Sequence, residues 1–282
     1  MNISVTDNSR DIFTELKEIG FYGLDVGFAE YSAREQILAG DFGSFPKKYQ
    51  LIKNAGLKMC QTHLTYYPGH LKPLGNGTYK DYEDYMLPMF IKEIEFASYM
   101  NCRTAVMHPY FEKSKENSRN GNLTLIEKLL PVLEKNNVIL SVENIFGPNY
   151  TDVHHTTADD LLFYAEHFNS PYLGICLDTG HAVTLNQNPI EMLKAVKNHL
   201  TALHVHRTVP GQDMHLIPYF DGRYDWNEFY DILAASDYKG TFNMELVAPR
   251  NVSRDAVIAH YRLAYEMAKS IVNKQTFEGE LL

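Results

Sequence analysis

Short apolar or β-branched runs alternate with longer amphipathic segments along the chain, and this alternation recurs about eight times. The short runs are typical of strands, and the longer segments repeat apolar positions at helical spacing. The runs that we predict as strands are Ile3–Thr6, Gly23–Gly27, Lys58–His63, Thr104–His108, Val138–Glu143, Leu173–Asp178, Ala202–His206 and Thr241–Leu246. The segments that we predict as helices are Asp11–Ile19, Pro46–Asn54, Asp81–Met100, Asn122–Lys135, Thr157–His167, Pro189–His199, Trp226–Ser236 and Asp255–Val272.

The spacing of these runs predicts the fold. Eight units in 282 residues give about 35 residues each, the length that a strand, a helix and two loops require. No hinge rich in Pro, Gly or Ser interrupts the series, so we predict one α/β domain over residues 1–282, a (β/α)8 TIM barrel. An open doubly wound sheet is the alternative, but no Gly-rich dinucleotide fingerprint follows an early strand.

Composition restricts the partners that we expect. The net charge of -9 disfavours electrostatic capture of nucleic acid, which needs clustered Lys and Arg. The sequence shows no signal peptide and no run of about 18 apolar residues for a membrane span. We therefore expect a cytoplasmic protein without membrane contact. The spacing of Cys60, Cys102 and Cys176 matches no metal finger, and we expect buried free thiols.

Side chains that bind metals collect where the predicted strands end. The carboxyl ends of barrel strands converge on one mouth, so we expect these side chains to lie close together. A lone histidine there is usually structural, but a carboxylate after an apolar run is costly unless a cation or a donor compensates it. The residues at or near the strand ends are His63, His108, Glu143, Asp178, His204, His206 and Glu245.

Four of these residues predict a metal site. Glu143, Asp178, His204 and Glu245 supply three carboxylates and one imidazole. That set suits Mn²⁺, Mg²⁺, Co²⁺ or Zn²⁺ and leaves coordination positions for substrate oxygens.

Nearby residues add candidate ligands. His181 follows Asp178 by three residues in LDTGH, so the turn after this strand can present both side chains to the mouth. Asp213 and His215, in DMH, have the spacing for two side chains of one loop to reach one ion. A solvated loop is an equally good interpretation of the DMH sequence.

Other residues are candidates for contact with a substrate. His206 and Arg207 either bind an anionic group or only line the rim of the mouth. Tyr66 and Tyr67 either form an aromatic wall for a sugar ring or only cover the end of the barrel. His181 is also a candidate substrate contact.

Motifs of one family lie at these positions in barrel order: THLTYYPG, MHPY, VENIFG, LDTGHA, LHVHR, DMHLIPYFDGRYDW and MELV. Each motif is weak alone, but their order and spacing extend over essentially the whole chain. With them the chain resembles the xylose-isomerase-like barrel superfamily. This superfamily includes sugar-phosphate isomerases and epimerases, the ketose 3-epimerases and endonuclease IV.

The resemblance to the ketose 3-epimerases implies a reaction. Glu143, Asp178, His204 and Glu245 are similar to the four ligands of one divalent metal, and Glu143 and Glu245 would exchange protons with a substrate carbon. The metal would hold two oxygens of a sugar or sugar phosphate and stabilise the enediolate. A metal-dependent sugar isomerase or epimerase is therefore the leading hypothesis, with Zn or Mn ahead of Co or Mg. Dimers and tetramers are common among similar proteins, so the resemblance also allows a homo-oligomer.

The resemblance to endonuclease IV implies an alternative, zinc-dependent hydrolysis of phosphodiesters at abasic DNA. The seventh strand reads HVHR where the endonuclease pattern reads HLND, which departs from this alternative. A sugar-binding barrel without catalysis is a third hypothesis, which the complete ligand set disfavours. Nine residues are similar to the endonuclease's trinuclear zinc ligands and imply capacity for one or two further ions: His63, His108, Glu143, Asp178, His181, His204, Asp213, His215 and Glu245.

Overall fold

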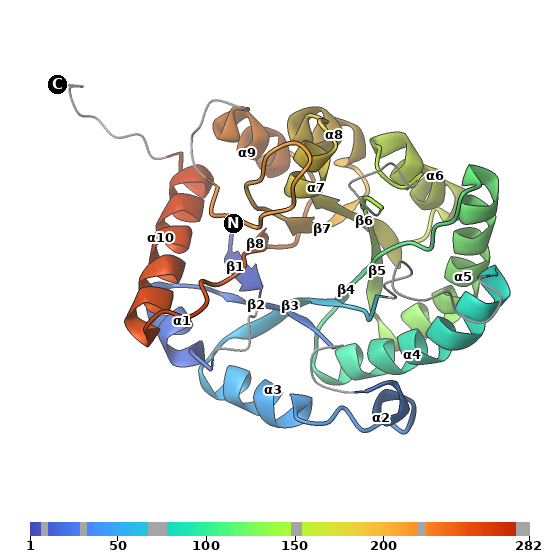
Figure 1. Ribbon diagram of the computed structural model, residues 1–282, viewed down its shortest axis with the longest axis horizontal. Helices are drawn as coiled ribbons and strands as arrows, with labels where there is room; N and C mark the ends of the chain where they lie inside the picture. The colour runs from blue at the N-terminus through green and yellow to red at the C-terminus, as the bar shows by residue number, and fades with distance from the viewer. Residues whose placement is uncertain (7–10, 29–32, 67–77, 148–153, 219–223, 275–282) are drawn as a thin grey trace.

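Eight parallel strands form a nearly closed barrel with helices around it (Figure 1). The computed structural model describes residues 1–6, 11–28, 33–66, 78–147, 154–218 and 224–274. Neighbouring strands pair in the order β7-β6-β5-β4-β3-β2-β1-β8. The strands are β1 Ile3–Thr6, β2 Gly23–Gly27, β3 Lys58–His63, β4 Thr104–Met107, β5 Ile139–Glu143, β6 Leu173–Asp178, β7 Leu200–His204 and β8 Phe242–Met244.

The backbone of Val205 joins the two edge strands, β7 and β8. Its N–H donates to the carbonyl oxygen of Asn243 at 2.8 Å, and its carbonyl oxygen accepts from the N–H of Glu245 at 3.1 Å. Both bonds lie at the carboxyl ends of the strands. Glu245 is therefore held beside the end of β7, one residue after β8 ends.

Helices surround the barrel, and several begin at a side-chain cap. Thr78 accepts a hydrogen bond from the N–H of Asp81 in α4, and Thr157 accepts one from the N–H of Asp160 in α6. The helices are α1 Phe13–Ile19, α2 Arg34–Leu38, α3 Phe45–Asn54, α4 Tyr79–Tyr99, α5 Lys115–Asn136, α6 Ala158–Phe168, α7 Thr179–Thr184, α8 Pro189–Val196, α9 Trp226–Ala234 and α10 Arg254–Val272. Within the described ranges, none of them combines the length and the hydropathy that a membrane span requires.

The predicted barrel is confirmed, with local differences. Strands β1, β2, β3 and β6 have the predicted bounds, whereas β7 begins and ends two residues early, so His206 lies beyond it. Helices α2 and α7 were not predicted because both are short, and α7 starts directly after a strand. Cys102 and Cys176 are buried as expected, but Cys60 is only half-buried because it lies near the exposed start of β3.

Glu93 is a fully buried carboxyl group on α4. Its oxygens accept hydrogen bonds from the N–H of Thr65 at 3.0 Å and from the Thr65 hydroxyl. Burial raises the pKa of Glu93 to about 7, and the hydrogen bonds from Thr65 only partly oppose this shift.

Glu93 is expected to make the free energy of unfolding depend on pH. The folded-state pKa lies above the ordinary value of 4.5, so the native state binds the extra proton between these values and loses stability as pH rises through them. Glu93→Gln removes this loss, so its stability relative to wild type should rise by roughly 3 kcal/mol between pH 5 and pH 9. Urea unfolding at both pH values measures the difference, and a constant difference would contradict the prediction.

Candidate metal centre

The carboxyl ends of four strands bring three carboxylates and one imidazole together at the barrel mouth. Glu143, Asp178 and His204 are the last residues of β5, β6 and β7, and Glu245 follows β8. One ligand atom from each lies within 4.8 Å of the others. The first three residues are fully buried, and Glu245 exposes 14% of its side chain. We call these four residues the inner cluster.

The ring of His204 has a defined orientation in the inner cluster. Its Nδ1 lies 2.8 Å from Oε1 of Glu143, 3.4 Å from Oε2 of Glu245 and 3.7 Å from Oδ2 of Asp178. Among the described residues, Oδ2 of Asp178 and Oε2 of Glu245 are buried and make no hydrogen bond. Buried polar atoms without partners are costly, so this arrangement fits a bound cation.

Two histidines approach Glu143 from the neighbouring strands. Nε2 of His108, after β4, lies 3.0 Å from Oε2 of Glu143, and Nε2 of His63, at the end of β3, lies 3.4 Å from it. The half-exposed ring of Tyr66 stacks on His108 with 5.0 Å between ring centroids. Tyr67, the other predicted wall residue, lies outside the described residues.

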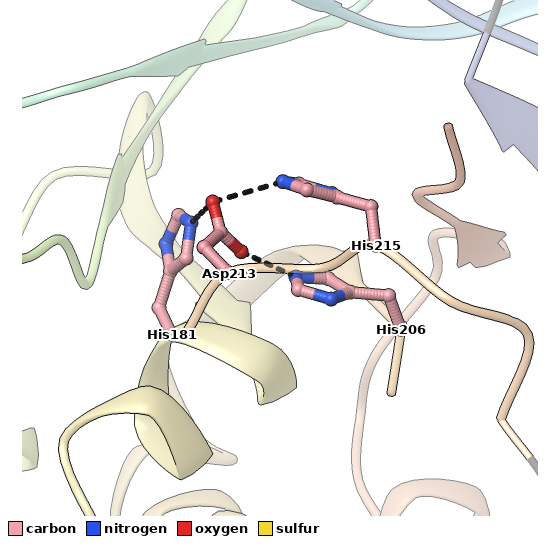
Figure 2. A group of neighbouring side chains, drawn as sticks. All are labelled: His181, His206, Asp213 and His215. Atoms are coloured by element: carbon pink, nitrogen blue, oxygen red, sulfur yellow. Dashed lines mark hydrogen bonds and ion pairs between the residues drawn. The ribbon is translucent and has the colours of Figure 1, made fainter. Parts of the chain in front are cut away.

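Figure 2 shows a second group of side chains, His181, His206, Asp213 and His215. His206 of this group lies 3.1 Å from Asp178 of the inner cluster. The Asp213 carboxylate lies between three imidazole rings: Oδ2 is 3.1 Å from Nε2 of His215 and 3.9 Å from Nε2 of His181, and Oδ1 is 3.8 Å from Nε2 of His206. One ligand atom from each of the four residues lies within 4.8 Å of the others. We call these residues the outer cluster.

Asp178 belongs to the inner cluster and also touches the outer one. Its Oδ1 accepts a hydrogen bond of 2.6 Å from the N–H of His181 and so caps α7, and it lies 3.1 Å from Nε2 of His206. The Asp178 side chain therefore helps to position His181 and is at the same time part of the inner cluster.

Charge interactions oppose the effect of burial on the pKa values in the site. Burial raises the pKa of Glu143, but His204 and His108 lower it overall to well below its ordinary range. Burial lowers the pKa of His215, but the charge of Glu245 and other carboxylates raises it overall to about 10. Positive charge is therefore strongly favoured among these carboxylates.

Asp25 is a site residue that the sequence analysis missed. It lies in the interior of β2, fully buried, with Oδ2 at 3.2 Å from Nε2 of His204 and 3.5 Å from Nδ1 of His63. Gln61 donates a hydrogen bond of 3.0 Å to the same oxygen. Burial raises the pKa of Asp25, but His63 and His204 lower it overall. A charged residue inside the short run GLDVG was the available signal.

The two residues considered for the rim lie in different surroundings. His206 is fully buried in the outer cluster rather than at the rim. Arg207 is half-buried, and its backbone pairs with Leu216, with an N–H to oxygen distance of 2.8 Å. Substrate contact by Arg207 and Tyr66 stays a prediction.

Comparison with known proteins gives a family match. The family described as the xylose isomerase-like TIM barrel matches residues 13–264. An L-ribulose-5-phosphate 3-epimerase, UlaE, of Escherichia coli O1:K1 / APEC is 24% identical over 164 residues, which cover 57% of this chain and 55% of that protein. A probable endonuclease 4 of Mesomycoplasma hyopneumoniae strain J is 36% identical over 94 residues, or 32% of each chain. The chain thus matches about half, or less, of these two relatives' lengths.

Solved structures share the fold. A D-tagatose 3-epimerase-like protein superposes with a TM-score of 0.71 at 19% identity, over 97% of this chain and 99% of that one. The 3-keto-D-glucoside 4-epimerase YcjR of E. coli superposes with a TM-score of 0.71 at 16% identity, over 96% and 99%. At such identities the likeness establishes the barrel alone.

Proposed function

Because the chain belongs to the xylose isomerase-like TIM barrel family, we propose that it is a metal-dependent isomerase or epimerase of a sugar or sugar phosphate. The observation that carries the proposal is the inner cluster, in which three carboxylates meet one imidazole; within the described residues, Oδ2 of Asp178 and Oε2 of Glu245 are buried without a hydrogen bond. Similarity to the L-ribulose-5-phosphate 3-epimerase supports the same class of reaction.

The donors of the inner cluster fit one divalent ion. Three carboxylates and one imidazole suit Mn²⁺, Co²⁺, Mg²⁺ or Zn²⁺, and Glu143, Asp178, His204 and Glu245 would hold it. When bound, such an ion supplies Lewis-acid stabilisation of the negative charge that develops on the sugar oxygens.

The chain's own residues would bind the sugar and move its proton. Glu143 and Glu245 enter the mouth from β5 and from the end of β8. One carboxylate would remove a proton from the carbon beside the carbonyl, and the other, already protonated, would donate a different proton to the enediolate. Donation to the same carbon from the other face inverts it. Donation to the adjacent carbon, with transfer of the hydroxyl proton between the two oxygens, exchanges ketose for aldose. The Tyr66 ring, stacked on His108, would offer an apolar face to the sugar.

The test is proton exchange at the substrate carbon. A panel of ketoses and ketose phosphates is incubated with the protein and Mn²⁺, Co²⁺ or Zn²⁺ in D₂O, and NMR follows deuterium entry beside the carbonyl. An abasic-site DNA duplex is assayed in parallel. We expect exchange with at least one sugar and an intact duplex, and cleavage without exchange would overturn the proposal.

The second candidate function is hydrolysis of a phosphodiester at abasic DNA, the reaction that the duplex assay would measure. The outer cluster and the partial match to a probable endonuclease 4 favour it. The net charge of -9 opposes it, because binding to DNA relies on phosphate contacts from Lys and Arg.

Asp25→Asn is expected to weaken binding of the inner ion by roughly 10- to 100-fold, as loss of an outer-shell partner does. Asp25 lies 3.2 Å from the ring nitrogen of His204 that faces away from the inner cluster, so its charge orients that ring. Titration calorimetry with Mn²⁺ measures the affinity. Glu93→Gln changes another buried carboxyl group outside the cluster and should leave the affinity unchanged. Wild-type affinity in Asp25→Asn would show that Asp25 does not orient His204.

A further inference from the structure

We propose that the outer cluster is a closed zinc site in which His206 is the fourth protein ligand, so that its ion stabilises the mouth instead of acting on substrate. This site is distinct from the inner cluster on which the proposed function rests. The inference is therefore tested by zinc binding and not by sugar turnover.

The outer cluster has the donors that zinc prefers. It offers three imidazoles and one carboxylate, whereas the inner cluster offers three carboxylates and one imidazole. Nitrogen-rich sets favour zinc, and oxygen-rich sets are also suited to Mn²⁺ and Mg²⁺. The two clusters are thus expected to select different ions.

His206 is a buried residue of the outer cluster whose Nε2 lies 3.1 Å from Oδ1 of Asp178. Its side chain is fully buried, and neither ring nitrogen makes a hydrogen bond among the described residues. Oδ1 of Asp213, 3.8 Å from Nε2 of His206, makes none either. A buried imidazole needs a donor, an acceptor or a cation at its nitrogens. An ion held between these two groups would satisfy both.

The surrounding chain is built to place this ring. A Cβ atom on Gly180 would lie 1.9 Å from Cε1 of His206, so glycine leaves the space that the ring occupies. The N–H of His206 donates to the Thr179 hydroxyl at 3.2 Å, and this hydroxyl donates to the carbonyl oxygen of His206 at 3.3 Å. The ring stacks on His215 with 4.1 Å between centroids. The turn after β6 therefore fixes His206 against the other ligands.

Four protein ligands leave no open position on a tetrahedral zinc ion. Structural zinc sites are closed in this way, whereas catalytic sites keep a position for water. The ligands come from α7, from the segment after β7 and from the loop that carries Asp213 and His215. The ion would join these three segments. The endonuclease pattern HLND has Asn where this chain has His206, so the fourth ligand is a departure from that pattern.

The experiment compares zinc binding by wild type and His206→Asn, which restores the endonuclease residue. Zinc per chain is measured by elemental analysis, and affinity by competition with a chromogenic chelator after the inner cluster is loaded with Mn²⁺. We expect one tightly bound zinc in wild type and at least about a hundredfold weaker zinc binding in the variant. The Co²⁺-substituted spectrum should change from four-coordinate to a higher coordination number.

Two further variants make the result specific. Gly180→Ala should also weaken zinc binding, because the added methyl group displaces the His206 ring. His260→Asn removes a half-buried imidazole on α10 whose Nε2 makes no hydrogen bond within the described residues. This variant should bind zinc as tightly as wild type does. Unchanged zinc affinity in His206→Asn would overturn the proposal. Weaker Mn²⁺ binding with unchanged zinc binding would overturn it too, because His206 would then only position Asp178 for the inner cluster.

Discussion

Glu143→Gln is expected to lower sugar turnover by at least about a thousandfold and to stop exchange of carbon-bound hydrogen with solvent. Glu143 is fully buried, lies in hydrogen-bond contact with His204 and approaches His108 and His63. The amide keeps the volume but removes the charge that would bind the ion and accept the proton. Steady-state rates and deuterium incorporation measure both effects.

Glu93→Gln is the matched control for Glu143→Gln. Both substitutions change a fully buried glutamate, but Glu93 lies on α4 and bonds only to Thr65 in the described chain. Its turnover should equal that of wild type. Wild-type turnover in Glu143→Gln, or equal losses in the two variants, would contradict the assigned role of Glu143.

Removal of divalent ions is expected to abolish sugar turnover and to lower the melting temperature by roughly 10 °C. Without an ion, protonated histidines supply the positive charge beside the three carboxylates of the inner cluster in the described chain. Burial lowers the pKa of His63, but the charge of Asp25 raises it to about 10, so this compensation is present at neutral pH and lost as pH rises through that value. Calorimetry of chelated and reloaded protein measures the shift at pH 7 and pH 10.

The difference in melting temperature between chelated and reloaded protein should be larger at pH 10 than at pH 7. Ion binding must displace protons from histidines at neutral pH, so it should also release protons into the buffer. A chelated protein that keeps its melting temperature at both pH values would show that the clusters need no ion. Activity restored by Mn²⁺ or Zn²⁺ is the control for irreversible damage.

The fold was predictable because each strand of the barrel is a short apolar run followed by a helix. Glu143, Asp178 and His204 could be found because polar residues directly after such runs must converge at one mouth. The structure brings all nine predicted ligands into the inner cluster, the outer cluster or contact with Glu143.

Asp25 and the setting of His206 were not predicted, for physical reasons. Asp25 lies inside a strand, and its contact with His204 joins strands that are not neighbours in the sheet. His206 lies two residues beyond the end of β7, so its neighbours depend on how the chain continues after the strand. The ring of His206 packs against Gly180, where a Cβ atom would clash with it, and this contact forms only in the folded chain.

Asp178 would link ions bound in the two clusters thermodynamically. One of its oxygens faces His204, and the other caps α7 and approaches His206. An ion bound at the first oxygen would withdraw charge from the second, so each ion would change the affinity for the other by the same factor. Each cluster would thus bind its ion with one affinity when the other cluster is empty and with another when it is filled. A titration with either metal would therefore depend on the occupancy of both clusters.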